Sequence, residues 1–237
     1  MGKKSKNYLK NRYYSHYSIF SPSCIVMKIA GKNIEKEASR FLNGKLLDIG
    51  CGEKWKKDLI GQYVDEYIGL DHKDSLHDKS NVDIYGSVYD IPVGNNEFDS
   101  VLCTAVLEHT EEPDRAIAEC FRVLKKNGHA LYTIPLFWHL HEEPRDFFRY
   151  TKYGLKYIFE KNGFEIIKMI PMSGFWITFG AEFNYYLNSI SSRFIPNLIK
   201  PFIAFNNFLF SLLDKIDRKF NKSTEIFTWM YLVIVKK

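Results

Sequence analysis

Residues 46–52 read LLDIGCG, and this stretch decides the fold. A short apolar strand ends in an acid, Asp48, and the loop that follows holds Gly50 and Gly52 one residue apart. Glycine lets a backbone turn sharply and approach a ligand with no side chain in between. A helix that begins after such a loop offers free N–H groups to that ligand. The alternative interpretation is a tight turn with a purely structural role.

Strands and helices are expected to alternate around this stretch. The hydrophobic pattern predicts strands over residues 45–49, 67–70, 83–86, 98–104, 129–134 and 164–170. It predicts helices over residues 24–42, 54–63, 114–126 and 151–162. A β-favouring run over residues 227–235 is expected to return to the sheet as a last strand. This alternation indicates an α/β fold with right-handed βαβ units on a parallel sheet.

A second acid, Asp71, ends the second predicted strand. A carboxylate at that place can accept both hydroxyls of a ribose, which would also suit a dinucleotide enzyme. Two features speak against a dinucleotide. The loop does not continue as G-x-G-x-x-G, and Glu53 beside it would repel a pyrophosphate. The β-favouring run that comes last suits a sheet with a terminal antiparallel strand.

With these motifs the sequence resembles the class I S-adenosylmethionine-dependent methyltransferases, in particular the small-molecule group typified by the ubiquinone-pathway methylases. The pieces that carry the resemblance are LLDIGCG, YIGLD, GSVYDIPVGNNEFDSVLCTAVLEH, AECFRVLKKNGHALYTIP and GFEIIKM, over about residues 45–170. The resemblance implies a Rossmann-like sheet of seven strands in the order 3-2-1-4-5-7-6, with strand 7 antiparallel. It also implies S-adenosyl-L-methionine as the cofactor.

The resemblance assigns cofactor contacts to eight positions. Asp48, Gly50 and Gly52 would line the methionine moiety, and Asp71 would hold the ribose. The positions beside the adenine are Ser87 and Val88, and those facing the sulfonium or methyl side are Cys103 and Thr104. Two positions depart from the family pattern: Lys54 stands where many members have a third loop glycine, and Ser87 replaces the usual acid.

Candidates for acid–base chemistry lie in two segments. Residues 135–151, PLFWHLHEEPRDFFRYT, resemble the HxxPxDxxRxT pattern of methyltransferases in surface-polysaccharide and lipid-linked sugar pathways. We expect His141 of this segment to be the catalytic base, with His109, from the segment VLEH, as the second candidate. An ion pair of Asp146 with Arg149 at the start of the next helix is the structural alternative for those two residues. No metal is expected, because His139 and His141 are spaced two apart, which does not place a pair of ligands on one helix.

The charge is concentrated at the N-terminal end. The 237 residues carry a net charge of +5, but nine basic and two acidic residues give residues 1–40 a charge of +7. The rest of the chain therefore sums to −2, which argues against a nucleic-acid partner. An arm that touches phosphate or an anionic membrane is left open. Four cysteines without a C-x-x-C pair predict reduced, buried thiols.

The domain organisation is expected to be a basic N-terminal arm or lid over residues 1–23 and a methyltransferase domain over residues 24–237. An aromatic-rich helical insertion over residues 174–222 lies between the sixth and seventh strands. Its apolar stripe predicts an amphipathic helix that packs on the domain, contacts a membrane surface or, as a third alternative, spans a bilayer. Without a signal peptide motif, we expect a cytoplasmic protein, with peripheral contact at the inner membrane face left open.

The functional expectation is a methyltransferase that acts on an oxygen of a small-molecule or glycan-precursor acceptor, such as a lipid-linked sugar. One alternative is a membrane-associated quinone or lipid methyltransferase. The alternative from another class is a protein that binds the cofactor without turnover and acts through its partners.

Overall fold

The computed structural model describes residues 17–75, 78–191, 198–221 and 223–237. The chain divides into two compact units. The first, which we call the helical unit, comprises residues 1–33, 137–139 and 171–230. The second, the sheet unit, comprises residues 34–136, 140–170 and 231–237. Of the predicted arm over residues 1–23, residues 1–16 lie outside the described part of the chain.

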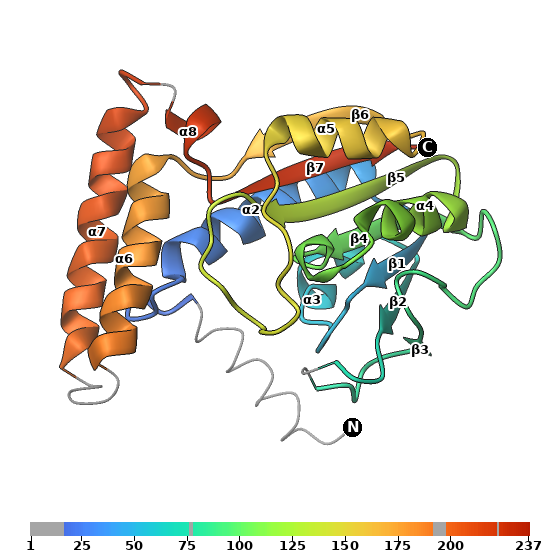
Figure 1. Ribbon diagram of the computed structural model, residues 1–237, viewed down its shortest axis with the longest axis horizontal. Helices are drawn as coiled ribbons and strands as arrows, with labels where there is room; N and C mark the ends of the chain where they lie inside the picture. Colours follow the sequence, from blue (N-terminus) through green and yellow to red (C-terminus); the bar gives the residue numbers. More distant parts are fainter. Residues whose placement is uncertain (1–16, 76–77, 192–197, 222) are drawn as a thin grey trace. The chain divides into compact units, whose positions relative to one another are not determined.

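A seven-stranded sheet in the order β3-β2-β1-β4-β5-β7-β6 forms the core of the fold, as predicted (Figure 1). The strands are β1 (Lys45–Ile49), β2 (Glu66–Asp71), β3 (Ile84–Tyr85), β4 (Phe98–Thr104), β5 (Leu124–Pro135), β6 (Glu165–Pro171) and β7 (Met230–Lys236). The pairs β1–β2, β1–β4, β2–β3 and β4–β5 are parallel. Strand β7 runs the other way: Lys237, just past its end, exchanges backbone hydrogen bonds with Asn127 and Gly128 near the start of β5.

The register brings the ends of three strands together. Ile49, the last residue of β1, lies opposite Leu70 of β2 and Cys103 of β4. These positions are almost completely buried, which explains why β1 and β4 read as near-continuous apolar runs. In an open parallel sheet the ligand crevice lies outside these carboxyl ends.

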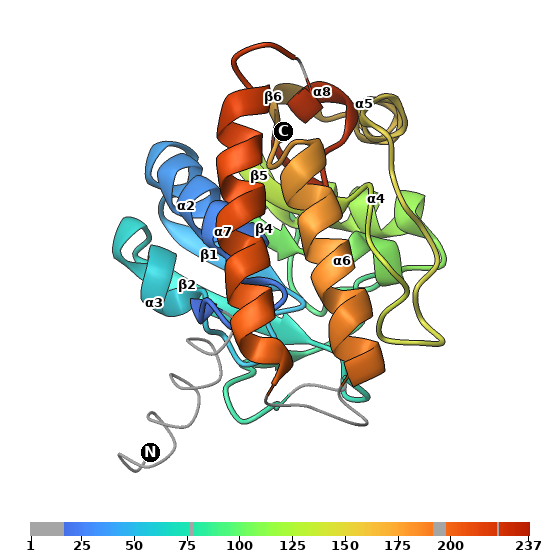
Figure 2. The same ribbon diagram turned by 90° about the vertical axis from the view of Figure 1, so that its left-hand side faces the viewer.

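Helices cover both faces of the sheet. Figures 1 and 2 show α3 (Lys57–Ile60) and the later part of α2 (Cys24–Phe41) on one face, and α4 (Pro113–Val123) and α5 (Lys152–Lys161) on the other. Helix α5 begins after Thr151, whose hydroxyl accepts a hydrogen bond from the backbone N–H of Gly154 at 3.1 Å. This cap satisfies one of the free donors of the first turn, as expected from a threonine at this place.

Several predicted boundaries are wrong, and two of them concern helices. The helix expected over residues 54–63 shrinks to α3 and a 3₁₀ turn (Gly61–Tyr63), because Lys54 adopts a left-handed φ of 56°. The helix expected over residues 114–126 ends at Val123, since Leu124 already pairs with Phe98 as the first residue of β5. Sheet pairing at this point outweighs the local helical pattern.

The helical unit contains α6 (Phe175–Ser191), α7 (Ile199–Asp217) and α8 (Ser223–Ile226), so the predicted insertion is helical. Figure 2 shows α6 and α7 side by side. A buried amide cluster joins them: Asn184 donates to Asn207 at 2.9 Å and accepts from Asn206 at 3.1 Å. Pro201 does not interrupt α7, because this residue lies in the first turn of the helix, where a backbone N–H would have no helical partner.

Two further findings concern membrane crossing and the cysteines. None of the helices among the described residues has both the length and the apolar character that crossing a membrane requires. All four cysteines are free and buried, as predicted. Burial raises the pKa of the Cys51 and Cys120 thiols to about 12, which keeps both protonated.

Candidate functional site

A cavity of about 320 Å³ opens at the carboxyl ends of the strands in the sheet unit. Four residues assigned to the cofactor from the sequence line it: Gly50, Asp71, Ser87 and Val88. The cavity therefore lies at the place that the strand order predicts.

The glycine loop is held against β2. The backbone N–H groups of Gly50 and Cys51 both donate to the carbonyl of Leu70, at 2.9 and 3.0 Å. Gly50 has a φ of +69°, and a Cβ atom built there would collide with the side chain of Val106. The loop thus needs glycine for its conformation and for its close packing on the cavity wall.

Asp71 joins the two motifs that the sequence singled out. One carboxylate oxygen accepts the backbone N–H of Gly52 and the other accepts the N–H of His72, each at 2.7 Å. Each oxygen has a further lone pair, and the residue lines the cavity. Asp71 can therefore fix the loop and accept ribose hydroxyls at once.

Asp48 is completely buried beneath the loop. Its Oδ2 accepts the hydroxyl of Tyr67 at 2.7 Å, while its Oδ1 has no hydrogen-bond partner. Burial raises the pKa of the carboxyl, an effect that the nearby Lys56 and the Tyr67 hydrogen bond oppose. A buried carboxylate with an open oxygen is suited to an incoming ammonium group.

Lys54, the departure from the family loop, has a structural role. Its ammonium forms an ion pair with Asp83, whose carboxylate also accepts the N–H of Gly69 at 2.7 Å. Any Cβ atom at Gly69 would collide with the Lys54 side chain. The positively charged side chain therefore lies across β2 and ties the loop to the residues before β3.

The other predicted cofactor positions differ in accessibility. The Ser87 hydroxyl accepts the N–H of Tyr89 at 3.2 Å, within the cavity wall. Cys103 and Thr104 are buried in β4 and do not line the cavity. Burial raises the pKa of the Cys103 thiol well above its usual value. These two residues support the wall rather than form its surface.

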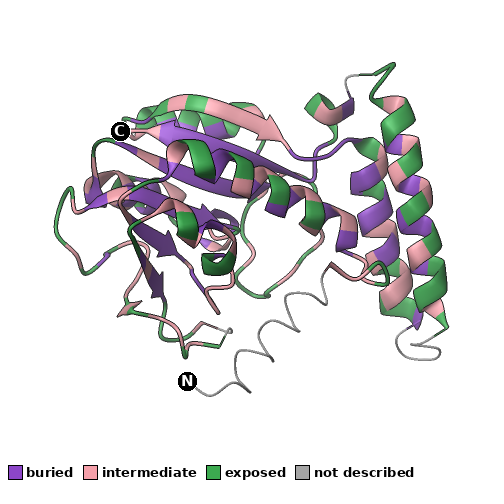
Figure 3. Ribbon diagram, turned by 180° about the vertical axis from the view of Figure 1, so that it is seen from behind, coloured by how far each residue is buried: buried purple, intermediate pink, exposed green. Residues whose placement is uncertain are grey.

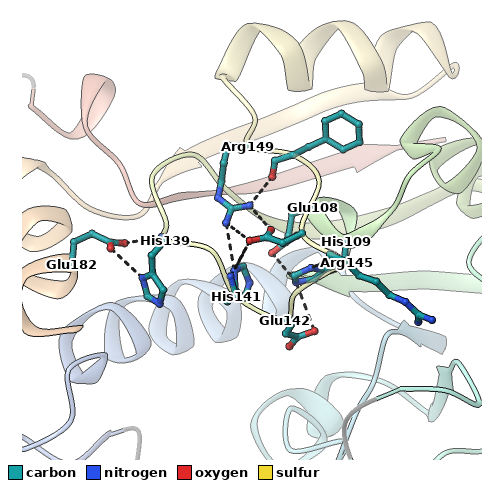
Figure 4. A network of polar contacts seen from close by, with 10 residues as sticks. Glu108, His109, His139, His141, Glu142, Arg145, Arg149 and Glu182 are labelled. Carbon is teal, nitrogen blue, oxygen red and sulfur yellow. Dashed lines mark hydrogen bonds and ion pairs between the residues drawn. The ribbon is translucent and has the colours of Figure 1, made fainter. Parts of the chain in front are cut away.

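Figure 4 shows a polar network next to the cavity. The ring of His109 lines the cavity, and its Nδ1 lies 2.5 Å from the backbone carbonyl of Arg145. Because a carbonyl can only accept, Nδ1 carries the proton in the neutral ring and Nε2 keeps its lone pair. His141 meets this ring edge to face at 4.7 Å between centroids and does not itself line the cavity.

Asp146 orients His141. Its carboxylate accepts the backbone N–H of His141 at 2.9 Å, and its Oδ2 lies 3.3 Å from the ring Nδ1. Arg149 binds the same carboxylate with both terminal nitrogens, at 2.6 and 2.7 Å, and this holds the pKa of Asp146 well below its usual range. The predicted ion pair of Asp146 with Arg149 is therefore present just before Thr151, the cap of α5. It also positions His141.

Glu108 is a buried member of the same polar network. Its carboxyl is 1% exposed, and its Oε2 has no hydrogen-bond partner. Burial raises the pKa of this group to about 8, so it is largely protonated at neutral pH. Ligand atoms of Glu108, His109 and His141 lie within 4.8 Å of one another. The Arg149 guanidinium lies 3.4 Å from the His141 ring and already brings positive charge here, so we assign the cluster no metal ion.

The remaining histidine of this segment, His139, belongs to the helical unit. Glu182 of α6 accepts its backbone N–H at 3.2 Å and contacts its ring Nδ1 at 3.1 Å (Figure 4). His139 and His141 therefore have separate carboxylate partners.

Several cavity residues were not assigned a role from the sequence. They include His72, Tyr89, Thr110, Arg145 and Phe147. His72 directly follows Asp71, so its place at a strand end was a usable signal. Arg145 and Phe147 reach the cavity because the N–H groups of Phe147 and Phe148 both bond to the carbonyl of Glu108, a long-range contact without a sequence signature.

Comparisons with known proteins agree with this geometry. A family of methyltransferase domains matches residues 47–132. A probable S-adenosylmethionine-dependent methyltransferase of Mycolicibacterium smegmatis is 32% identical over 107 residues, which cover 43% of this chain and 42% of that protein. A ubiquinone biosynthesis O-methyltransferase of Coxiella burnetii is 26% identical over 149 residues, covering 58% and 60%. The matches thus span about half the length of these curated relatives.

Solved structures share the fold. A SAM-dependent methyltransferase from Archaeoglobus fulgidus superposes with a TM-score of 0.58 at 16% identity, covering 89% of this chain and 94% of that one. The [4+2]-cyclase SpnF gives a TM-score of 0.55 at 21% identity, covering 88% and 80%. At such identities the likeness concerns the fold alone, and a cyclase among the neighbours shows that one fold hosts more than one reaction.

Proposed function

Because the chain belongs to the class I S-adenosylmethionine-dependent methyltransferases, we propose that it transfers the methyl group of this cofactor to an oxygen of a small-molecule or glycan-precursor acceptor. The observation that carries the proposal is the position of His109. Its ring lines the cavity, and the Arg145 carbonyl leaves Nε2 as the basic nitrogen.

The described residues fit the cofactor. The open Oδ1 of Asp48 suits the ammonium of its methionine moiety, and the Gly50 cradle leaves room for a ligand beside the backbone. Asp71 suits the ribose hydroxyls, and Ser87 and Val88 line the part of the cavity assigned to the adenine. When bound, the cofactor supplies a methyl group on a positively charged sulfur, a good leaving group for attack by oxygen.

The chain itself aligns the acceptor and takes up a proton. A hydroxyl acceptor loses its proton as the new C–O bond forms, and Nε2 of His109 accepts it. His141, held by Asp146, packs against the His109 ring and keeps it oriented. Positioning of the two reactants in the cavity lowers the barrier of such a displacement, because the entropy of bringing them together is lost on binding. The sequence pointed to His141 as the base; the proposal keeps both histidines and gives the proton transfer to His109.

Two measurements test the proposal. Titration calorimetry with S-adenosylmethionine tests the site, and the Asp71→Ala variant should bind much more weakly than the wild-type chain. Incubation with methyl-labelled cofactor and a panel of hydroxyl-bearing acceptors, sugars linked to lipid diphosphates among them, tests the reaction. Base-stable label in an ether linkage is expected. Cofactor binding without transfer to any hydroxyl would instead favour the alternative of a binding protein without turnover.

A further inference from the structure

Helix α7 exposes a continuous apolar stripe that no described residue covers. Its members share one side of the helix at spacings of three or four residues, and we call them the α7 stripe: Phe202, Phe205, Phe208, Leu212 and Ile216. Phe205 and Phe208 are 58% and 65% exposed. Burial of side chains of this size is strongly favourable, so their exposure in a row marks a surface that meets an apolar partner.

The stripe is not the face that holds the helical unit together. The opposite side of α7 is buried and contains Ile203, Asn206, Asn207, Phe210 and Asp214. Phe210 packs against Phe179 of α6 at 5.6 Å between ring centroids, and a Cβ atom on Gly180 would collide with it. Figure 3 shows buried and exposed positions alternating along both helices. The packing of α6 against α7 therefore does not use the stripe.

The charges on α7 are sorted with respect to the stripe. Lys215, in the last turn of α7, and Lys219, two residues past its end, follow Leu212 and Ile216 by three residues each, and both lysines are exposed. The two acids of this segment have partners of their own. Asp214 is buried and pairs with Arg218 at 2.5 Å, and Asp217 accepts a hydrogen bond from Asn221 at 2.7 Å. Among the described residues, the charged side chains next to the stripe are therefore lysines.

Positive charge also prevails among the described residues of the helical unit. They include six Lys or Arg and four Asp or Glu, a net charge of +2. A second copy of the chain would bring a like charge to the stripe, and repulsion disfavours that occupant. A partner with an anionic surface and an apolar layer would contact both the apolar side chains of the stripe and the two lysines.

We propose that the α7 stripe docks on an anionic lipid membrane, with its aromatic side chains in the interface and Lys215 and Lys219 at the headgroups. Helix α7 then lies in the plane of the surface, in keeping with a helix that is amphipathic and too polar on its buried side to cross the bilayer. Such docking would place the enzyme where lipid-linked acceptors are found. The inference concerns binding alone and stands or falls independently of methyl transfer.

Flotation of the full chain with vesicles tests the proposal. The wild-type chain should float with vesicles of phosphatidylcholine and phosphatidylglycerol, and much less with phosphatidylcholine alone. The double variant Phe205→Ser/Phe208→Ser should lower the partition coefficient about tenfold or more. The variant Lys215→Glu/Lys219→Glu should lower it on the anionic vesicles and weaken its dependence on salt.

The matched control is Tyr153→Ser/Tyr157→Ser, which removes two exposed aromatic side chains from α5, and it should float like the wild-type chain. Unchanged circular dichroism confirms that each variant is folded, and Leu212→Ser replaces the Phe pair if that variant does not fold. Absence of wild-type flotation, or equal flotation of the stripe variants, would overturn the proposal. So would a concentration-dependent dimer that Phe205→Ser/Phe208→Ser abolishes while no vesicles are bound, because the stripe would then meet a second copy.

Discussion

The carboxylate of Asp71 accepts the backbone N–H of Gly52 at 2.7 Å. This hydrogen bond joins the end of β2 to the glycine loop after β1, two motifs that are separate in the sequence. One side chain thus shapes the loop and faces the cavity. A change at Asp71 is therefore expected to affect both ligand binding and stability.

Replacing Asp71 by Asn tests this double role. The carboxylate receives two N–H donors, from Gly52 and His72, whereas an amide offers only one oxygen. We expect Asp71→Asn to lower the free energy of unfolding by about 1–3 kcal/mol and the affinity for S-adenosylmethionine about tenfold or more. Denaturant unfolding and calorimetry measure the two effects. Asp74→Asn, in the exposed turn that follows, is the control and should change neither; wild-type affinity in Asp71→Asn would show that the carboxylate does not hold the cofactor.

Gly50→Ala should disturb the cavity directly. Its φ of +69° disfavours any L side chain by about 1–2 kcal/mol, and the added methyl group would push against Val106. We expect a loss of cofactor affinity that Val106→Ala in the same chain partly restores, because it removes the collision but not the backbone strain. Gly94→Ala serves as the control, because a Cβ atom there would meet only Glu97 Oε2, at an ordinary contact distance of 3.5 Å. Full restoration by Val106→Ala would mean that the left-handed conformation carries no cost.

The two histidines should differ in their effect on turnover. His109→Ala removes the proposed proton acceptor, and we expect turnover of a hydroxyl acceptor to fall about 100-fold or more, with a much smaller change in cofactor affinity. His141→Ala leaves the acceptor nitrogen in place and should cost about tenfold, through misorientation of the His109 ring. Single-turnover kinetics with labelled cofactor measures both. A larger loss in His141→Ala than in His109→Ala would return the role of base to His141.

Glu108 should make stability depend on pH. Its pKa is about 8 in the folded chain and near 4.5 when unfolded, so the folded state binds more protons between these values. Stability from this group is therefore full below about pH 4.5 and is lost as pH rises toward 8, by at most about 1.4 kcal/mol per pH unit. Glu108→Gln has no such proton, so it should gain stability relative to the wild-type chain over this range in denaturant unfolding at pH 5, 6.5 and 8. The exposed Glu112→Gln is the control; if the Glu108→Gln and wild-type curves run parallel, the buried carboxyl does not titrate as proposed.

Most of the fold was accessible from local patterns. Strands β1 and β4 were predicted with their observed ends, because each is a buried apolar run bounded by polar residues or glycine. The errors lie where distant contacts decide the local structure. Lys54 leaves the helix because its ammonium reaches Asp83, and Leu124 leaves the helix because it pairs with Phe98. Neither partner is visible from the neighbouring sequence.

The same distinction between local patterns and distant contacts applies to the candidate site. Asp48, Gly50 and Asp71 could be singled out because a parallel strand carries its ligand-facing residues at its carboxyl end, a rule that acts within a few residues of each strand. The choice between His109 and His141 as the catalytic base could not be made from the sequence, because it depends on which ring reaches the cavity. That is set by the hydrogen bond from the His109 ring to the Arg145 carbonyl and by the Asp146 contact to His141.

The sequence by itself determined the alternation of strands and helices and the glycine loop, since each is written in short motifs whose geometry is local, and its resemblance to a known family implied the sheet order and the cofactor. The tertiary structure alone decided which side chains line the cavity, which carboxyl is kept protonated and whether the apolar stripe of α7 is covered or exposed. These properties depend on burial and on contacts between segments far apart in the chain, and no periodicity of the sequence carries them.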